Sequence, residues 1–164
     1  MRTRLMQILF TVFILSVQLS CAQDTRSEAA QRTADEKKLQ EYFTVHNIHA
    51  QKASGIYYTI SRAGTGHKIL AGETVTIDYT GKLLDGTVFD SNTDPKFQHP
   101  EPLTVEIGAG KVIKGWDKGV QLLQKGSVAT LYIPSGMAYG AANKGPIPAN
   151  SILVFDVAVT DVTK

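Results

Sequence analysis

From Gly55 to its C-terminus the chain repeats one pattern, in which short runs of β-branched and aromatic residues alternate with clusters of turn residues. Runs of this kind, about four to eight residues long, are typical of β-strands. Several alternate apolar with polar residues, as a sheet with one face in water requires. The dipeptide Asp85-Gly86 predicts a tight hairpin. The runs predict strands over residues 56–60, 74–79, 103–107, 129–133 and 152–159.

One segment of this region has the spacing of a helix. Within residues 114–123, Trp116, Val120 and Leu123 lie at positions i, i+4 and i+7. One short helix among five or six antiparallel strands predicts an α+β domain in which the sheet wraps around the helix. The pattern alone leaves a small β-barrel as the alternative.

The first residues of the chain have the layout of an export signal. Arg2 and Arg4 precede an apolar run over residues 5–17, and small residues follow around Cys21. The run is shorter than the roughly 20 apolar residues of a membrane-spanning helix. Residues 1–20 are therefore predicted to be a signal peptide, with a buried N-terminal helix as the alternative.

The sole cysteine, Cys21, stands where bacterial lipoprotein signals place the cysteine that is lipidated after cleavage, and the segment resembles such a signal. Gln18 departs from that pattern, which usually has an aliphatic residue three positions before the cysteine. Ordinary cleavage after Ala22, with loss of Cys21, is the alternative. We expect lipidation of Cys21, which would anchor the exported protein to a membrane, and we expect the protein in the periplasm or cell envelope.

Charge argues against nucleic acid as a partner. The chain has 17 Lys and Arg against 15 Asp and Glu, and removal of Arg2 and Arg4 with the signal leaves 15 against 15. Proteins that bind nucleic acid need a clustered basic surface to neutralise phosphates. A single cysteine also excludes an internal disulfide.

Residues 21–54 are predicted to be a polar linker with a short helix. Thr33 and Glu36 have the spacing of a capping box, and Leu39 and Phe43 share one helical face. A helix over about residues 34–45 is expected. Because its apolar stripe is narrow, it should lie lightly on the domain of residues 55–164 or act as a spacer from the membrane.

Several kinds of active site are poorly supported. Ser135-Gly136 lacks the turn motif of hydrolase serines. His46 and His49 are three residues apart, but a metal ion normally needs further ligands. The glycines around residues 64–66 and 108–110 lack the spacing of phosphate-binding loops. We therefore expect no cofactor and no metal.

What remains is a set of aromatic and aliphatic residues close to turns, with one acid among them. Each could simply be part of the core, since large apolar side chains are usually buried. Together they could also line a pocket. The set comprises Tyr79, Phe89, Asp90, Val112, Ile113, Trp116, Tyr139, Ile147 and Phe155.

The order of these motifs resembles the FK506-binding type of peptidyl-prolyl cis-trans isomerase. The resemblance covers about residues 55–162 and rests on the motifs Tyr79–Ser91, Val112–Trp116, Ala138–Gly140 and Ile152–Val157. It implies an FKBP-like fold, a five- or six-stranded antiparallel sheet wrapped around one short α-helix, with an apolar pocket between them.

The resemblance also implies a role for each residue of the set. Trp116 would be the pocket floor, and the N–H of Ile113 and the hydroxyl of Tyr139 would hydrogen-bond carbonyls of a bound peptide or macrolide. Asp90 would face the twisting amide. The walls and rim would be formed by Tyr79, Phe89, Val112, Phe155, Leu103 and Ile147.

Some positions depart from the family pattern. Leu103 stands where many members carry an aromatic residue, and Met137 replaces a frequent tyrosine. The basic residue that often pairs with the acid has Lys96 as its nearest match. The loop over residues 141–150 lacks the familiar histidine at the rim. These departures bear on sequence preference and on the affinity for inhibitors.

Proline isomerisation suits such a pocket because it needs no nucleophile. The rotation barrier of about 18–20 kcal/mol comes from amide resonance. A twisted amide has less charge separation than a planar one, so apolar surroundings favour it.

The implied partners are proline-containing polypeptides and FK506-type macrolides, and the default oligomeric state is a monomer. The alternatives are a proline-segment binding module, a holding chaperone or a scaffold subunit of an envelope assembly.

Overall fold

The computed structural model describes residues 26–164. The predicted signal peptide and Cys21 lie outside the described residues. Within residues 26–164, no helix is long and apolar enough to cross a membrane. A helix occupies residues 26–45 and is called the N-terminal helix below. The other elements are β1 (Gln51–Ala53), β2 (Ile56–Arg62), β3 (Thr74–Leu83), β4 (Val88–Ser91), η1 (Pro95–Phe97), β5 (Leu103–Glu106), α2 (Lys114–Val120), β6 (Val128–Ile133), η2 (Ser135–Met137) and β7 (Leu153–Thr163).

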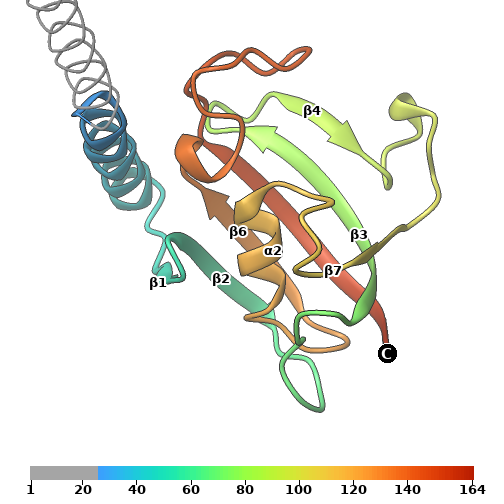
Figure 1. The fold of residues 1–164 in the computed structure, drawn as a ribbon. Coiled ribbons are helices and arrows are strands. Elements are labelled where there is room, and N and C mark those ends of the chain that lie inside the picture. The colour runs from blue at the N-terminus through green and yellow to red at the C-terminus, as the bar shows by residue number, and fades with distance from the viewer. Residues whose placement is uncertain (1–25) are drawn as a thin grey trace, which may run out of the picture.

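The strands form one antiparallel sheet in the order β1-β2-β6-β7-β3-β4, with β5 also paired to β3 (Figure 1). Strand β3 runs along the whole of β7 on one side. On its other side its first half pairs with β5 and its second half with β4. The predicted α+β class with an antiparallel sheet is confirmed. The sheet has seven strands, because β1 and β4 are too short for their patterns to be noticed in the sequence.

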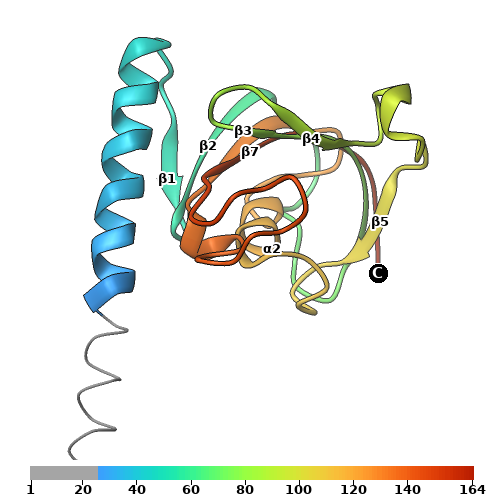
Figure 2. The same ribbon diagram turned by 90° about the horizontal axis from the view of Figure 1, so that it is seen from above.

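Helix α2 lies against the inner face of the curved sheet, as Figure 2 shows. A Cβ atom on Gly115 would lie 2.2 Å from Ile133, and one on Gly119 would lie 2.7 Å from Leu131. The two glycines therefore let the helix backbone approach β6 closely. Helix α2 ends at Val120, before the expected residue 123, because the last turn tightens to hydrogen bonds between residues three apart.

The predicted hairpin is present between β3 and β4. The N–H of Leu83 donates to the carbonyl of Thr87 over 2.9 Å. Asp85 accepts a bond from the N–H of Thr87, and Gly86 has φ +90°, which a glycine adopts without strain. In this turn Asp85 thus supplies a hydrogen-bond acceptor and Gly86 supplies the positive φ.

The N-terminal helix begins earlier than the predicted residue 34, and the predicted capping box is wrong. Thr33 lies inside the helix, where its hydroxyl donates to the carbonyl of Ala29 over 3.1 Å. Glu36 instead binds Lys52 of β1, with 2.8 Å between the ammonium nitrogen and a carboxylate oxygen. Thr33 and Glu36 therefore have the spacing of a capping box but lie in the interior of a longer helix.

The N-terminal helix packs firmly on the outer face of the sheet, and so corrects the expectation of a light contact. Leu39 is fully buried and Phe43 is 7% exposed. The centre of the Phe43 ring lies 5.2 Å from the centre of the Tyr57 ring and 5.0 Å from that of Tyr132, and both pairs pack edge to face. Consecutive residues of a strand face opposite sides, so this second cluster lies across the sheet from α2. Figure 2 shows the helix standing outside β1 and β2.

Candidate active site

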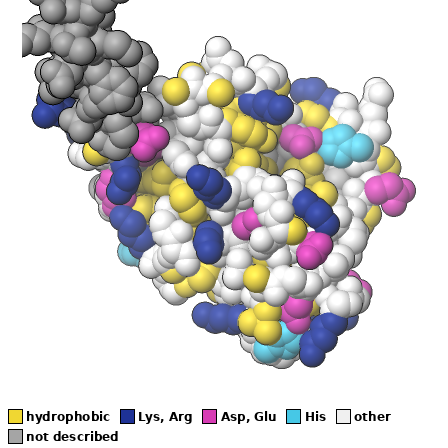
Figure 3. All heavy atoms as spheres, in the orientation of Figure 1, with side chains coloured by type: hydrophobic (Ala, Val, Ile, Leu, Met, Phe, Trp, Pro, Cys, Tyr) yellow, Lys and Arg dark blue, Asp and Glu magenta, His cyan; other side chains and the backbone are white. Residues whose placement is uncertain are grey.

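A cavity of about 190 Å³ opens between α2 and the ends of the strands. Its residues come from four strands, from α2, and from the segments before α2 and after η2. On the face of the molecule in Figure 3, apolar side chains reach the surface among interspersed acidic and basic ones. The cavity is lined by Tyr79, Phe89, Asp90, Leu103, Lys111, Val112, Ile113, Trp116, Tyr139 and Phe155.

Nearly all the residues singled out in the sequence therefore meet in one place. Ile147 is the exception, because it does not line the cavity. Its side chain is 5% exposed and belongs to the main hydrophobic core. It lies in a tight turn in which Lys144 and Ile147 exchange backbone hydrogen bonds. Lys111 lines the cavity but was not predicted, because a surface lysine in a loop carries no pattern of its own.

The floor of the cavity is aromatic. The side chain of Trp116 is 3% exposed. The centre of its ring lies 5.6 Å from that of Tyr79 and 5.5 Å from that of Phe155, each at an interplanar angle of 87°. Edge-to-face contacts of this kind are the favoured arrangement of aromatic pairs. Among buried side-chain nitrogen and oxygen atoms of the described residues, only Nε1 of Trp116 has no hydrogen-bond partner. The floor is thus made of aromatic rings packed on one another, and its one buried polar atom without a partner is Nε1 of Trp116.

Gly81 lets the aromatic walls close over the sheet. It lies on β3, opposite Phe155 of β7 in the strand register and next to β4. A Cβ atom at this position would lie 2.7 Å from the ring of Phe89 and 2.8 Å from that of Phe155. The rings of Phe89 and Phe155 pack edge to face at 5.6 Å. Sequence reasoning missed this role, because only the fold shows which rings lie above the glycine.

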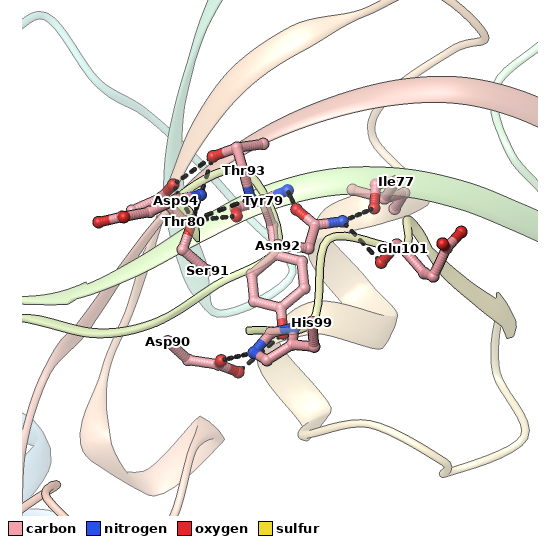
Figure 4. Close-up of polar contacts among 10 residues, drawn as sticks. All are labelled: Ile77, Tyr79, Thr80, Asp90, Ser91, Asn92, Thr93, Asp94, His99 and Glu101. Atoms are coloured by element: carbon pink, nitrogen blue, oxygen red, sulfur yellow. Dashed lines mark hydrogen bonds and ion pairs between the residues drawn. The ribbon is translucent and has the colours of Figure 1, made fainter. Parts of the chain in front are cut away.

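Asp90 is the one acid of the cavity, and two side chains hold it. The hydroxyl of Tyr79 donates to Oδ2 of Asp90 over 2.7 Å, and Nε2 of His99 lies 2.7 Å from Oδ1 (Figure 4). Burial raises the pKa of the Tyr79 hydroxyl, and the hydrogen bond and charge of Asp90 raise that pKa further. Tyr79 therefore remains a neutral donor at physiological pH.

The basic partner of Asp90 is His99, and this corrects the match to Lys96. The ammonium group of Lys96 instead lies 5.8 Å from the centre of the Phe97 ring. His99 is nine residues from Asp90 in a loop of irregular structure, so no spacing rule in the sequence joins the two. The pairing depends on how that loop folds back.

Ser91 and Asn92 hold this loop in place, as Figure 4 shows. The side-chain oxygen of Asn92 accepts from the N–H of Tyr79 over 2.7 Å, and its amide donates to the carbonyls of Ile77 and Glu101. The hydroxyl of Ser91, fully buried, bonds the carbonyl of Tyr79. One side chain thus ties β3 to both ends of the loop, and so fixes the approach of His99 to the cavity.

The segment before α2 is fixed from the helix itself. The carboxylate of Asp117 accepts from the N–H of Gly108 over 3.0 Å and from the N–H of Gly110 over 3.2 Å. An acid in the first turn of a helix is also favoured by the helix dipole. Ile113 caps the helix through its carbonyl. None of the hydrogen bonds between described residues uses the N–H of Ile113, so this donor is available at the cavity.

Comparison with known protein families supports the resemblance seen in the motifs. A family model described as "FKBP-type peptidyl-prolyl cis-trans isomerase" matches residues 66–160. The matched range contains every cavity residue and excludes the N-terminal helix.

Individual relatives extend the similarity beyond that range. The chain is 38% identical to an FKBP-type isomerase, FkpA, of Aeromonas hydrophila over 85% of its own length and 52% of the relative's. It is 36% identical to a probable FKBP-type isomerase of Haemophilus influenzae over 93% and 62%. Among solved structures, Escherichia coli FkpA gives a TM-score of 0.67 at 31% identity, over 95% of this chain and 71% of that one. The chain spans about half the length of the curated FkpA relatives that it matches.

Proposed function

Because this chain belongs to the FKBP-type peptidyl-prolyl cis-trans isomerase family, we propose that it accelerates the isomerisation of X-Pro bonds in polypeptides. The observation that carries the proposal is a cavity floored by Trp116 and walled largely by aromatic and aliphatic side chains, with Asp90 and Tyr139 among its few polar side chains. A reaction that breaks no covalent bond needs such a pocket and no nucleophile.

The geometry gives each group a role. The proline ring would lie on the indole of Trp116, between the rings of Tyr79 and Phe155. The free N–H of Ile113 and the hydroxyl of Tyr139 would bind carbonyl groups of the peptide at the edge of the cavity. The substrate amide would thereby leave water for apolar surroundings, which favour its twisted, less polar form over the planar one.

Asp90 would act at the side of the cavity where the amide twists. Because Tyr79 and His99 each bond one of its carboxylate oxygens, its orientation is defined before a substrate arrives. A preorganised dipole stabilises a transition state without paying for its own reorientation. The same edge would accept a hydroxyl of an FK506-type macrolide, which we expect to compete with peptides.

Export and membrane anchoring are part of the proposal and rest on the sequence of residues 1–21 alone. Folding proteins outside the cytoplasm would be the substrates. Cell fractionation of the wild type and of a Cys21→Ser variant tests the anchor: lipidation predicts loss of the protein from the membrane fraction in the variant, and an unchanged distribution contradicts it.

The decisive experiment measures the cis-to-trans relaxation of a short X-Pro peptide. Wild-type protein should accelerate it, the macrolide should abolish the acceleration, and Trp116→Ala should lower kcat/KM at least about tenfold, the effect of losing about 1.4 kcal/mol of transition-state stabilisation. Val120→Ala is the matched control, because Val120 is fully buried on the same helix and does not line the cavity. It should lower stability and leave the kcat/KM of the folded protein unchanged.

The competing functions give different results in the same assay. A wild-type protein that is folded and binds the peptide or macrolide without accelerating relaxation would be a binding module, and the proposal would be wrong. If Trp116→Ala and Val120→Ala both fold and lose activity equally, the role proposed for the indole of Trp116 would be wrong.

A further inference from the structure

A buried acid lies on the N-terminal helix, away from the cavity. Asp35 is 1% exposed and stands outside the range matched by the family model. Its Oδ2 atom accepts from the backbone N–H of Ser135 over 2.8 Å and from the Ser135 hydroxyl over 2.7 Å. Its Oδ1 atom accepts from the side chain of Gln31 over 2.8 Å. Asp35 forms no ion pair with any residue of the described chain.

Ser135 begins the turn that carries Tyr139 to the cavity. The carbonyl of Ser135 accepts from the N–H of Ala138 over 2.9 Å and from that of Gly140 over 2.8 Å. Tyr139 lies between these two donors, so both of its neighbours in the chain are bonded to Ser135. Gly140 in turn accepts from the N–H of Asn150 over 2.7 Å. Three groups of Ser135 thus link the helix on one side to the Tyr139 turn on the other.

The link is demanding in energy as well as in geometry. A carboxylate removed from water must recover its lost hydration through hydrogen bonds, and here Ser135 supplies two of the three. Ser135 is fully buried, so without Asp35 its N–H and hydroxyl would face no water. The helix and the turn are therefore bound to one relative position.

We propose that Asp35 is a positioning residue for the isomerase: through Ser135 it sets the turn that places Tyr139 at the cavity. This inference rests on the proposed function for its effect on catalysis. It assigns the N-terminal helix to the working isomerase unit, although the helix does not line the cavity and lies outside the family-matched range. A change in how the helix packs on the sheet would thus also change the position of Tyr139 at the cavity.

Amide hydrogen exchange tests the structural half of the proposal without reference to activity. Asp35→Ala should speed exchange of the amides of Ser135, Ala138 and Gly140, and leave β3 and β7 protected. Glu36→Gln is the matched control, since the neighbouring Glu36 binds Lys52 and Tyr57 and does not reach the turn. Unchanged exchange in Asp35→Ala, or the same increase in Glu36→Gln, would overturn the proposal.

A double-mutant cycle on kcat/KM tests the catalytic half. Tyr139→Phe should lower kcat/KM about fivefold, the usual worth of one hydrogen bond, and Asp35→Ala about threefold. If Asp35 acts through Tyr139, the double variant should be no slower than Tyr139→Phe alone. Multiplied losses would mean that Asp35 acts on general stability, and would overturn a positioning role.

Conservative variants keep the test valid if Asp35→Ala does not fold. Asp35→Asn retains an acceptor oxygen and should keep kcat/KM within about twofold of the wild type, while Ser135→Ala loses the hydroxyl and should show part of the loss. Equal activity in the wild type and a folded Ser135→Ala that exchanges Gly140 normally would count against the proposal. If the wild type has no isomerase activity, the proposed function fails, and the exchange result still decides whether the helix fixes the turn.

Discussion

At the scale of single residues, the cavity is organised by side chains that hold one another rather than by isolated groups. Asp90 accepts from Tyr79 on one carboxylate oxygen and lies against His99 on the other. Gly81 leaves the space into which the rings of Phe89 and Phe155 close. Replacement of any of these residues is therefore expected to alter the position of another one as well.

The raised pKa of Tyr79 gives a prediction for alkaline solutions. Burial and the neighbouring Asp90 raise the pKa of its hydroxyl above the ordinary value of about 10, so the folded state favours the protonated phenol. The stability from this group is fully present below about pH 10 and is lost as the pH rises toward the higher pKa of the folded state.

Tyr79→Phe should therefore be less stable than the wild type by about 1 kcal/mol at pH 8, because it lacks the bond to Asp90. The gap should narrow above about pH 10, because the unfolded wild type then loses the phenol proton while the folded wild type keeps it. This lowers the stability of the wild type and does not affect Tyr79→Phe. Urea unfolding, followed by the fluorescence of the single tryptophan, measures the gap at each pH. A gap that stayed constant or widened up to pH 11.5 would contradict the raised pKa.

At the scale of secondary-structure elements, α2 and the sheet fit because two glycines face β6 and β2. The Cβ that Gly119 lacks would lie 2.7 Å from Leu131 and 2.9 Å from Ile56. The helix is only seven residues long, so its place depends on this packing more than on helix propensity. Since Trp116 lies on the same helix, the depth of the cavity depends on the same contact.

Gly119→Ala should lower the free energy of unfolding by up to about 2 kcal/mol. Alanine gains about 1 kcal/mol of helix propensity, but the overpacking against two buried side chains costs about 1–3 kcal/mol. Gly136→Ala is a suitable control, because its Cβ would meet no atom within 4 Å, and it should change stability by less than about 0.5 kcal/mol. Chemical denaturation of both variants gives the comparison, and an equal effect at the two sites would show that packing does not limit α2.

At the scale of the whole molecule, the sheet is covered on both faces. The core under α2 and the cluster around Leu39 and Phe43 lie on opposite sides of the strands β2, β6 and β7. Consecutive residues such as Val154 and Phe155 are consequently both buried. A sheet sandwiched in this way should unfold together with the helices on its two faces.

Phe43→Ala should reduce the stability of the whole chain by about 3 kcal/mol, as truncation of a buried phenylalanine usually does. Val45→Ala, two residues away and 79% exposed, should change stability by less than about 0.5 kcal/mol. Unfolding should remain a single transition when followed by circular dichroism and by tryptophan fluorescence. A separate early transition of the helix would show that it is an independent element.

The sequence by itself determined the class of fold and most of the cavity. Alternation of apolar and polar residues located the long strands, and the spacing of Trp116 and Val120 located α2, because both periods follow from local backbone geometry. The resemblance to the family named nine of the cavity residues, and the structure brings these together. It placed Ile147 at the rim, whereas the residue is buried in the core.

Only the tertiary structure decided which partners meet across long stretches of chain. The bond from Ser135 to Asp35 joins residues 100 apart, and the pair of His99 and Asp90 depends on a loop held by Asn92. The firm docking of the N-terminal helix likewise follows from aromatic residues on β2 and β6. Local propensity acts between neighbours in sequence, whereas these contacts form where folding brings distant groups out of water, and there each buried polar group needs a partner.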